Sequence, residues 1–354
     1  MQQRMAILIV VVGLTSAIFA QTSPSKTSYH AWWNDQYPNK PLNSPNAKKL
    51  PLITVNGNKF VDPQGQTVLF RGMAIADPDK VEHQGHWNLD LFQHVQQTGA
   101  RVVRIPVHPI AWRERGVQNY LALLDQAVEW CTQLGMYIDI DWHSIGNLET
   151  EVFQHPMYQT SHAETFNFWR TVADHFQGNN TVVFYELFNE PSNHSDQWGP
   201  VSWDEWKKLN EDLVIMIHSF DRNKIPIIAG FDWAYDLTPL RNSPLNVEGI
   251  AYSVHPYVFK RSKPWGPKWD EDFGFVAERF PLVATEFGFW TPPKPNPTTE
   301  GYPQSIVKYL ESRGIGWFCW VYDPEWEPAL IKSWDFTPTE AGKFFRDAMH
   351  GKVE

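Results

Sequence analysis

Two glutamates at the ends of apolar segments are the side chains of this sequence best placed to do chemistry. Glu190 follows the apolar run Val182–Asn189, and Glu286 closes the run that begins at Pro281. Apolar, β-prone runs are typical of strands buried on both faces, and a barrel presents functional groups where such strands end. Two acids at the ends of separate strands suggest hydrolysis of a glycosidic bond, which needs one protonated and one ionised carboxyl group.

The neighbours of the two acids suggest a different role for each. Two close carboxyl groups differ in protonation because ionising the second beside the first costs free energy. If the strands follow the expected order, the hydroxyl of Tyr257 donates to Glu286, keeps it ionised and suits it to be the nucleophile. Glu190, held at a strand exit by Pro191, suits the role of proton donor and general acid/base. The alternative is that either acid is only a member of a buried salt bridge.

Two further acids compete with this pair. Glu186 lies on the same strand face as Glu190 by two-residue alternation, but about four residues deeper in the strand. We expect Glu186 to be a structural acid paired with an arginine. Asp141, next to Trp142, is expected to form part of the wall of the site rather than to act as a catalyst.

The acids need a scaffold that brings strand ends together, and the sequence predicts one. Short apolar runs start at intervals of roughly 25–45 residues, the length of one strand and one helix with their loops. Amphipathic stretches with helical spacing lie between them, among them Tyr120–Leu134, Ala163–Phe176 and Trp203–Ser219. The eight predicted strands are Val68–Ala74, Val102–Pro106, Tyr137–Trp142, Val182–Asn189, Pro226–Ala229, Ile250–Ser253, Leu282–Glu286 and Gly316–Trp320.

This alternation predicts an α/β fold, a (β/α)8 TIM barrel that forms a single catalytic domain over residues 51–354. A doubly wound open sheet is the alternative, but no glycine-rich phosphate loop follows any of the runs. Residues 21–50, rich in Ser, Pro, Asn and Lys, are expected to be an N-terminal linker or strap, from which Trp32 and Trp33 pack on the domain.

Residues 1–20 are expected to be a signal peptide, which predicts a secreted, extracellular or periplasmic protein. They contain one basic residue, Arg4, then an apolar stretch from Met5 to Val12, then small residues through Ala20. An uncleaved membrane anchor is the alternative, but the apolar run is short for a membrane span. We therefore expect no membrane association of the mature form.

Composition narrows the class of ligand. A net charge of −10 argues against a nucleic-acid partner and against a polybasic membrane patch. Eighteen tryptophans favour a carbohydrate ligand, since indole faces stack on sugar rings, although about half of them are expected in the core. The two cysteines, Cys131 and Cys319, lie in apolar segments and are expected to be buried thiols; a disulfide between them is the alternative. No CxxC motif indicates a structural zinc.

The polar residues at the predicted strand ends carry a family resemblance. Six motifs occur in order: Arg104-Ile105-Pro106, Asp141-Trp142-His143, Asn189-Glu190-Pro191, His255-Pro256-Tyr257, Thr285-Glu286-Phe287-Gly288 and Phe318-Cys319-Trp320. With these motifs, over roughly residues 60–325, the chain resembles glycoside hydrolase family 5, and in particular its cellulases.

The resemblance implies a role for each matching residue. It makes Glu190 the general acid/base and Glu286 the nucleophile of a retaining mechanism through a covalent glycosyl-enzyme, with no cofactor. Asn189 would bind the sugar 2-hydroxyl, and Trp320 would be the sugar platform. The residues implied to hold Glu286 are Arg104 and Tyr257, and those implied to line the subsite at the bond are His143 and His255. A metal site at the two histidines is the alternative, but no third ligand stands at ligand spacing beside either.

Aromatic residues in the loops after the strands predict the shape of the substrate. An open cleft lined by indoles suits an internal stretch of polysaccharide, and we expect Trp112, Trp233 and Trp290 to form outer subsites. The other loop aromatics are Trp87, Trp198, Trp265, Trp269, Tyr322 and Trp326. Residues 292–297, a proline-rich segment, are expected to form a stiff lip on the seventh loop.

These features together predict a monomeric, endo-acting β-1,4-glucanase, a cellulase, whose partner is a β-1,4-linked glucan. A β-mannanase, a xyloglucanase or a mixed-linkage glucanase of the same fold would share all of them. A non-catalytic carbohydrate-binding barrel would keep the aromatic rim, but it would normally lose one of the two acids. Both acids are present, which favours the enzyme.

Overall fold

The structure is a computed structural model that describes residues 30–35, 49–193, 197–291 and 300–353. The predicted signal peptide, residues 1–20, and the proline-rich lip, residues 292–297, lie outside these ranges. Contacts divide the chain into Met1–Ala31 and Trp32–Glu354, and the second unit contains the fold described below.

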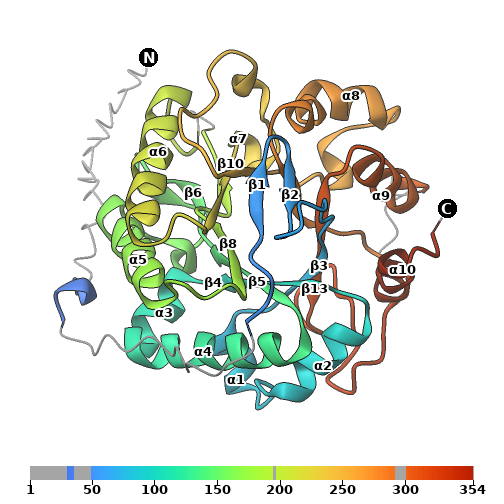
Figure 1. Cartoon of the computed structure of the whole chain (residues 1–354), viewed down its shortest axis with the longest axis horizontal. Helices are drawn as coiled ribbons and strands as arrows, with labels where there is room; N and C mark the ends of the chain where they lie inside the picture. The colour runs from blue at the N-terminus through green and yellow to red at the C-terminus, as the bar shows by residue number, and fades with distance from the viewer. Residues whose placement is uncertain (1–29, 36–48, 194–196, 292–299, 354) are drawn as a thin grey trace, which may run out of the picture. The chain divides into compact units, whose positions relative to one another are not determined.

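Eight parallel strands close into a barrel in the second unit, and this confirms the predicted (β/α)8 fold (Figure 1). Each strand pairs with the next in the chain, and the last pairs with the first to close the ring. In order, the strands are β3 (Arg71–Ile75), β4 (Val102–Val107), β5 (Tyr137–Trp142), β8 (Val182–Glu186), β10 (Ile225–Ala229), β11 (Ala251–Ser253), β12 (Leu282–Phe287) and β13 (Gly316–Tyr322).

The fourth barrel strand ends earlier than the sequence predicts. The predicted run extends to Asn189, but β8 ends at Glu186. Glu190 and Pro191 form a separate short strand, β9, which pairs with β6 (Ile145–Asn147) outside the barrel; β6 also pairs with β7 (Val152–Phe153). The amide of Asn189 donates to the carbonyl of Trp142, so the backbone turns from the barrel toward the loop after β5. This turn places Glu190 on β9, beyond the carboxyl end of the barrel.

Helices surround the barrel, as Figure 1 shows for the long helices α4, α5 and α6. Capping residues in the sequence determine where several of these helices begin or end. A capping box of Ser202 and Glu205 begins α6, and Gly135, in a left-handed conformation that suits glycine, ends α4. The helices are α1 (Pro78–His83), α2 (Leu89–Gln97), α3 (Pro109–Arg115), α4 (Val117–Leu134), α5 (His162–His175), α6 (Trp203–Phe220), α7 (Phe231–Ala234), α8 (Trp265–Asp272), α9 (Tyr302–Ser312) and α10 (Glu340–Met349). Short 3-10 helices are η1 (Trp32–Asn34), η2 (Pro156–Tyr158), η3 (Thr238–Arg241), η4 (Val258–Lys260) and η5 (Gly274–Glu278).

A hairpin closes the amino-terminal end of the barrel. Its strands are β1 (Thr54–Asn56) and β2 (Lys59–Val61), and it lies across the front of the barrel in Figure 1. Phe60 of the hairpin packs edge-on against Phe184 of β8, with ring centres 5.1 Å apart. Aromatic side chains therefore fill the amino-terminal end of the barrel. A catalytic site is expected at the opposite end, at the carboxyl ends of the strands.

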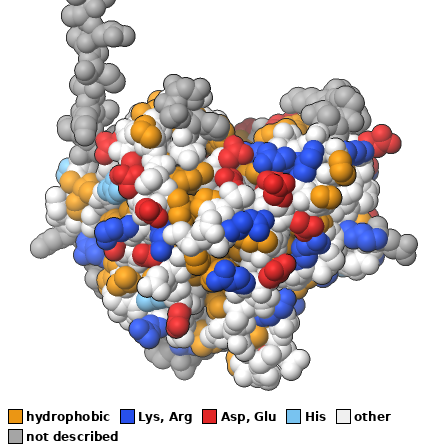
Figure 2. All heavy atoms as spheres, turned by 90° about the horizontal axis from the view of Figure 1, so that it is seen from above, with side chains coloured by type: hydrophobic (Ala, Val, Ile, Leu, Met, Phe, Trp, Pro, Cys, Tyr) orange, Lys and Arg blue, Asp and Glu red, His pale blue; other side chains and the backbone are white. Residues whose placement is uncertain are grey.

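The two cysteines are the buried thiols that the sequence predicts. Cys131 and Cys319 are both free and buried, and burial raises the pKa of each thiol. Among the described residues, no helix is long and apolar enough to span a membrane. Lys and Arg side chains are interspersed with Asp and Glu over the face seen in Figure 2.

Trp32 joins the segment before the barrel to the core. Its ring is buried and meets the ring of Trp112 edge-on, with centres 5.5 Å apart. Its Nε1 donates to Glu164 Oε1 at 2.9 Å, and Arg113 Nη1 donates to the other oxygen of that carboxylate at 2.7 Å. This part of residues 21–50 therefore belongs to the packed domain.

We predict that W32A lowers the free energy of unfolding by about 3 kcal/mol, because it leaves a cavity beside Trp112 and an unpaired acceptor on Glu164. Urea unfolding followed by circular dichroism measures this change. W33A is the matched control, since Trp33 is only half-buried and should cost less. Equal unfolding midpoints for W32A and the wild type would contradict this prediction.

Candidate active site

The predicted site residues converge at the carboxyl ends of the barrel strands. Glu190 and Glu286 face each other there: a carboxyl oxygen of each and a ring nitrogen of His255 all lie within 4.8 Å of one another. The remaining members come from five strands or the loops that follow them: Arg104, His143, Asn189, Tyr257 and Trp320. Residues more than 200 positions apart in the chain thus share one pocket, because every parallel strand ends at the same edge of the barrel.

Glu286 is buried and held by two donors. Arg104 Nη1 donates to Oε2 at 2.8 Å, and the Tyr257 hydroxyl donates to Oε1 at 2.9 Å. Burial raises the pKa of Glu286, while the charges of His255 and Arg104 and the Tyr257 hydrogen bond oppose the rise. Both oxygens therefore have fixed directions, and the contacts that the resemblance implied for Arg104 and Tyr257 are present.

Arg104 is fully buried and contacts four acceptors. Besides Glu286, its guanidinium donates to Glu186 Oε2 at 2.6 Å and to Asn189 Oδ1 at 2.7 Å. Its Nη2 also lies 3.0 Å from Asp141 Oδ2. Burial alone would lower the pKa of Arg104, but the surrounding carboxylates raise it well above its ordinary value. The group is therefore a permanent positive charge beneath the site.

Glu186 is the structural acid that the sequence predicts. It pairs with Arg104 and also accepts a 2.7 Å hydrogen bond from the hydroxyl of Thr285. Burial would raise the pKa of Glu186, but the Arg104 charge and hydrogen bonds from His255 and Arg104 outweigh it and lower the pKa to about 2. Glu186 is thus ionised at all ordinary pH values and lies below the pocket.

Glu190 contacts His255, a pairing that the sequence did not reveal. His255 Nδ1 lies 3.0 Å from Glu190 Oε1, and its Nε2 lies 3.1 Å from Thr285 Oγ1. Burial would lower the pKa of His255, but the Glu286 charge and the contacts with Glu186 and Glu190 raise it to about 9. The ring is therefore cationic at neutral pH. The side chain of Glu190 is 14% exposed, against 8% for Glu286, so Glu190 is the more accessible acid.

His143 and Trp320 stack on each other beside Arg104. Their rings are parallel, 3° apart in orientation, with centres separated by 5.4 Å. His143 Nδ1 lies 2.6 Å from Asp141 Oδ2. Burial, followed by the charges of His108 and Arg104, lowers the pKa of His143 well below its ordinary value. His143 is therefore neutral at pH 7, and Asp141 orients it, which is a more specific role than the wall position predicted for Asp141.

Four further residues lie close to the site, and the sequence singled out only one of them, Trp326, as a loop aromatic. Trp326 stacks on Trp320 with ring centres 5.8 Å apart, and His108 lies 4.7 Å from His143. The ring centre of Tyr158 lies 5.6 Å from that of His108 and 6.0 Å from that of His143, and burial with the charges of Glu190 and Glu286 raises the pKa of Tyr158 to about 12. Phe259 is 59% exposed and stacks on the ring of Tyr257 at 5.3 Å. Of the other three, only Phe259 carried a usable signal, because it is an aromatic residue two positions after the predicted site residue Tyr257.

Fewer of the predicted loop aromatics are accessible to a substrate than the sequence suggests. Trp233 and Trp290 are half-buried, and the ring of Trp290 lies 6.2 Å from that of Tyr257. The prediction for Trp112 is wrong: this residue is 0% exposed and packs on Phe168, so its faces are closed to a sugar. Trp112 begins the second turn of α3 rather than a loop, and its indole turns toward α5. The other loop aromatics apart from Trp326 are also buried: Trp87, Trp198, Trp265, Trp269 and Tyr322.

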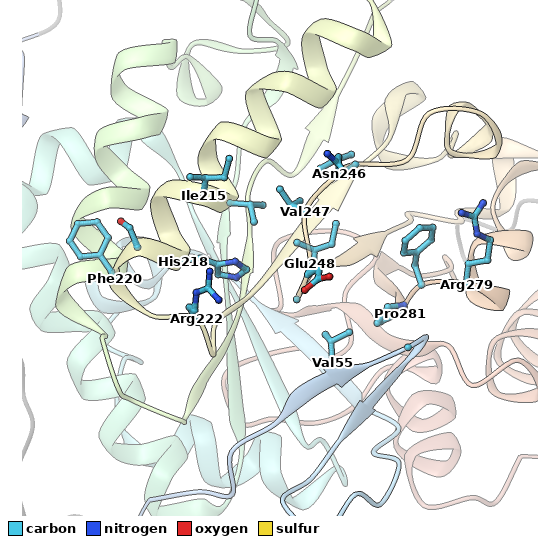
Figure 3. Close-up of a pocket in the computed structure, with 17 residues that line it drawn as sticks. Val55, Ile215, His218, Phe220, Arg222, Asn246, Val247, Glu248, Arg279 and Pro281 are labelled. Carbon is cyan, nitrogen blue, oxygen red and sulfur yellow. The ribbon is translucent and has the colours of Figure 1, made fainter.

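A groove of about 1390 Å³ lies at the opposite end of the barrel (Figure 3). Ile250 and Pro281, which precede strands β11 and β12, line it together with Val55 of the hairpin. Ile215 and His218 of α6 form one wall of this groove in Figure 3. Its lining contains none of the paired acids, so it is separate from the site of Glu190 and Glu286.

Comparison with known proteins agrees with this geometry. The family described as Cellulase (glycosyl hydrolase family 5) matches residues 61–325. An endoglucanase of Paenibacillus polymyxa is 23% identical over 317 residues, which cover 76% of this chain and 79% of the relative. An endoglucanase A of Butyrivibrio fibrisolvens is 24% identical over 230 residues, which cover 61% of this chain and 48% of that relative.

Among solved structures, a β-glucanase of Saccharophagus degradans is 42% identical and superimposes with a TM-score of 0.86, covering 92% of this chain and all of the other. The same enzyme has also been solved in complex with cellotetraose. The family match spans every strand of the barrel and both facing acids. The chain therefore belongs to glycosyl hydrolase family 5, the cellulase family of glycoside hydrolases.

Proposed function

We propose that the protein is an endo-acting β-1,4-glucanase that cleaves internal glucosidic bonds with retention of configuration. The observation that supports this most directly is the approach of Glu190 and Glu286, whose nearest carboxyl oxygens lie within 4.8 Å. Retaining glycosidases hold their two carboxyl groups about 5–5.5 Å apart, whereas inverting enzymes need about 6.5–9.5 Å to admit a water molecule.

Glu286 is the proposed nucleophile. Arg104 and Tyr257 aim its two oxygens and stabilise the carboxylate. In the first step, an oxygen of Glu286 forms a bond to the anomeric carbon while the glycosidic C–O bond breaks. The negative charge of Glu286 also stabilises the oxocarbenium-like transition state that develops at this carbon.

Glu190 is the proposed acid/base. It gives its proton to the departing glycosidic oxygen, and it then takes a proton from the water that hydrolyses the covalent glycosyl-enzyme. Its position on β9, beyond the end of the barrel and more exposed than Glu286, suits a group that gives a proton to the leaving sugar and then takes one from the incoming water. His255, 3.0 Å from Glu190 Oε1, orients this carboxyl group.

Asn189 and Trp320 are proposed to bind the sugar at the bond that is cleaved. Asn189 Oδ1 accepts from Arg104, so the amide is fixed, and its buried Nδ2 has no hydrogen-bond partner among the described residues. That nitrogen can therefore donate to the sugar 2-hydroxyl, a bond that strengthens in the transition state. Trp320, parallel to His143, offers an apolar surface for the same ring.

The donor set of Glu190, His255 and Glu286 could also hold a metal ion, but its surroundings favour proton chemistry. The permanently charged Arg104 already lies 2.8 Å from an oxygen of Glu286. A divalent cation would be repelled by this guanidinium and by the protonated form of His255. We therefore assign Glu286 to nucleophilic catalysis, and Glu190 with His255 to proton transfer, without a cofactor.

The substrate assignment rests on the relatives and on the aromatic residues of the cleft. The β-glucanase of Saccharophagus degradans, 41% identical in its cellotetraose complex, supports a β-glucan as the substrate class. Trp233 and Trp290 are the proposed outer subsites on this chain. Mannan, xyloglucan and mixed-linkage glucan are the competing polymers. Export is proposed from the leader-like residues 1–20, and a monomer is proposed as the active form.

The pair of acids can be tested by substitution. We predict that E286Q abolishes turnover, because the amide cannot form the covalent bond. We predict that E190A loses most activity on polysaccharide, by at least about 100-fold, and that azide partly restores its activity on aryl β-cellobiosides, which need little protonation. EDTA should leave the wild type unchanged. An E190A variant with full activity on polysaccharide would exclude the assignment.

Substrate preference can be measured on a panel of soluble polymers. We predict the highest kcat/KM on carboxymethyl-cellulose or another unbranched β-glucan, and lower values on galactomannan and xyloglucan. Viscosity should fall faster than reducing ends appear, since internal cleavage shortens chains before it releases many ends. Preference for galactomannan would replace the glucanase proposal with the mannanase alternative.

The raised pKa of His255 predicts a pH dependence of stability. A group whose pKa is higher in the folded state stabilises the fold fully below its unfolded value of 6.5, and this contribution is lost as the pH rises through about 9. The stability advantage of the wild type over H255Q should therefore shrink by about 3 kcal/mol between pH 6 and pH 10. Urea unfolding across this range measures the difference. A constant difference would show that His255 does not titrate there.

A further inference from the structure

A strained turn follows β10 at the mouth of the site. Asp232, Trp233 and Ala234 have φ angles of 56°, 55° and 56°, so three consecutive residues with side chains adopt the left-handed conformation. This conformation is unfavourable for an L-residue, because its Cβ atom lies too close to the following carbonyl oxygen. Such a turn persists only where its surroundings hold it in place, and such strain is concentrated at functional sites.

Lys260 of η4 holds this turn from the neighbouring loop. Its Nζ donates to the carbonyl of Asp232 at 2.5 Å and lies 3.3 Å from Oδ1 of the same residue. The ammonium group also lies over the ring of Trp233, 4.9 Å from its centre. The Lys260 side chain is only 10% exposed, so these contacts are shielded from water.

The packing around Trp233 leaves little freedom to the turn. Trp198 meets the ring of Trp233 edge-on, with centres 6.1 Å apart and planes at 88°. At the base of the turn, a side chain on Gly230 would come within 2.0 Å of the carbonyl oxygen of Asp236, so the backbone can close there only with glycine. One face of the Trp233 indole therefore meets the cation, and Trp198 packs on the ring at a right angle.

The turn lies on the side of the acid/base. Helix α7, which contains the turn, packs against the short strand β9 formed by Glu190 and Pro191. The carbonyl of Ala234 accepts a 2.7 Å hydrogen bond from the backbone amide of His255, the residue whose ring contacts Glu190. The acid/base protonates the departing sugar, so this is the leaving-group side of the cleft.

We propose that Lys260 is a positioning residue for the leaving-group side of the cleft, which fastens the strained turn so that Trp233 stacks on the sugar beyond the cleaved bond. Through the bond between Ala234 and His255, the turn adjoins the histidine that contacts Glu190. This inference rests on the proposed glucanase function and adds to it the group that sets the affinity for the leaving sugar.

Two substrates separate this role from a general effect on catalysis. A cello-oligosaccharide places glucose units on both sides of the bond, whereas an aryl β-cellobioside has only a phenol on the leaving side. Loss of the Trp233 platform should therefore weaken binding of the cello-oligosaccharide much more than binding of the aryl β-cellobioside. The difference should appear mainly in KM, because stacking contributes to binding in the ground state as well.

The experiment compares kcat and KM of the wild type and K260M on cellopentaose and on p-nitrophenyl β-cellobioside. K260M keeps the length of the side chain but lacks the ammonium group. We expect kcat/KM on cellopentaose to fall about tenfold, mainly through KM, and to change less than about twofold on the aryl substrate. K263M is the matched control: Lys263 lies 5.0 Å over Trp265 in the same loop but away from the acids, and it should leave both values unchanged.

A second variant tests the strain itself. Glycine has no side chain that penalises a positive φ, so A234G in the K260M background should recover part of the lost affinity for cellopentaose. If K260M acted only by removing a charge, A234G would not restore the affinity. Melting temperatures verify that all variants are folded. Equal kinetics of K260M and the wild type, or equal losses on both substrates, would overturn the role of Lys260. A wild type inactive on both substrates would instead overturn the proposed function.

Discussion

The positive charge of Arg104, buried inside the barrel, is the constraint on which the site depends. It is the shared donor for Glu186, Glu286 and Asn189, and it lies 3.0 Å from Asp141. Without it, several carboxyl groups would remain in a space closed to water, where an unpaired charge is very costly. Removing one member of such a network leaves the others uncompensated, so the network fixes a single arrangement.

This network explains why the two facing acids differ. Glu286 belongs to it directly and takes its direction from Arg104 and Tyr257. Glu190 lies on β9, outside these contacts of Arg104, and is linked to them through His255, whose other nitrogen approaches Thr285. A rigid, buried carboxylate beside a more accessible carboxyl group suits the proposed double displacement, in which only the second acid gives a proton to the leaving sugar and takes one from water.

The fold serves this site by leaving one end of the barrel free. The β1–β2 hairpin fills the amino-terminal end with aromatic packing, and the carboxyl ends of the strands carry the polar groups. Above them, the loops after β10 and β11 are joined by the contact of Lys260 with Asp232. The buried charge of Arg104 thus holds the acids inside the barrel, while contacts between loops hold the residues above them.

The sequence alone determined the barrel and the identity of its acids. Periodic apolar runs predict parallel strands, and all eight are present, because a strand buried on both faces must be apolar whatever its neighbours are. Motifs at the strand ends also located the acids, since barrel strands display their functional groups there. What only the tertiary structure decided is which groups meet across the pocket. The contact of His255 with Glu190, the burial of Trp112 and the left-handed turn at Trp233 depend on loops whose paths are set by distant packing, and no local pattern encodes such a path.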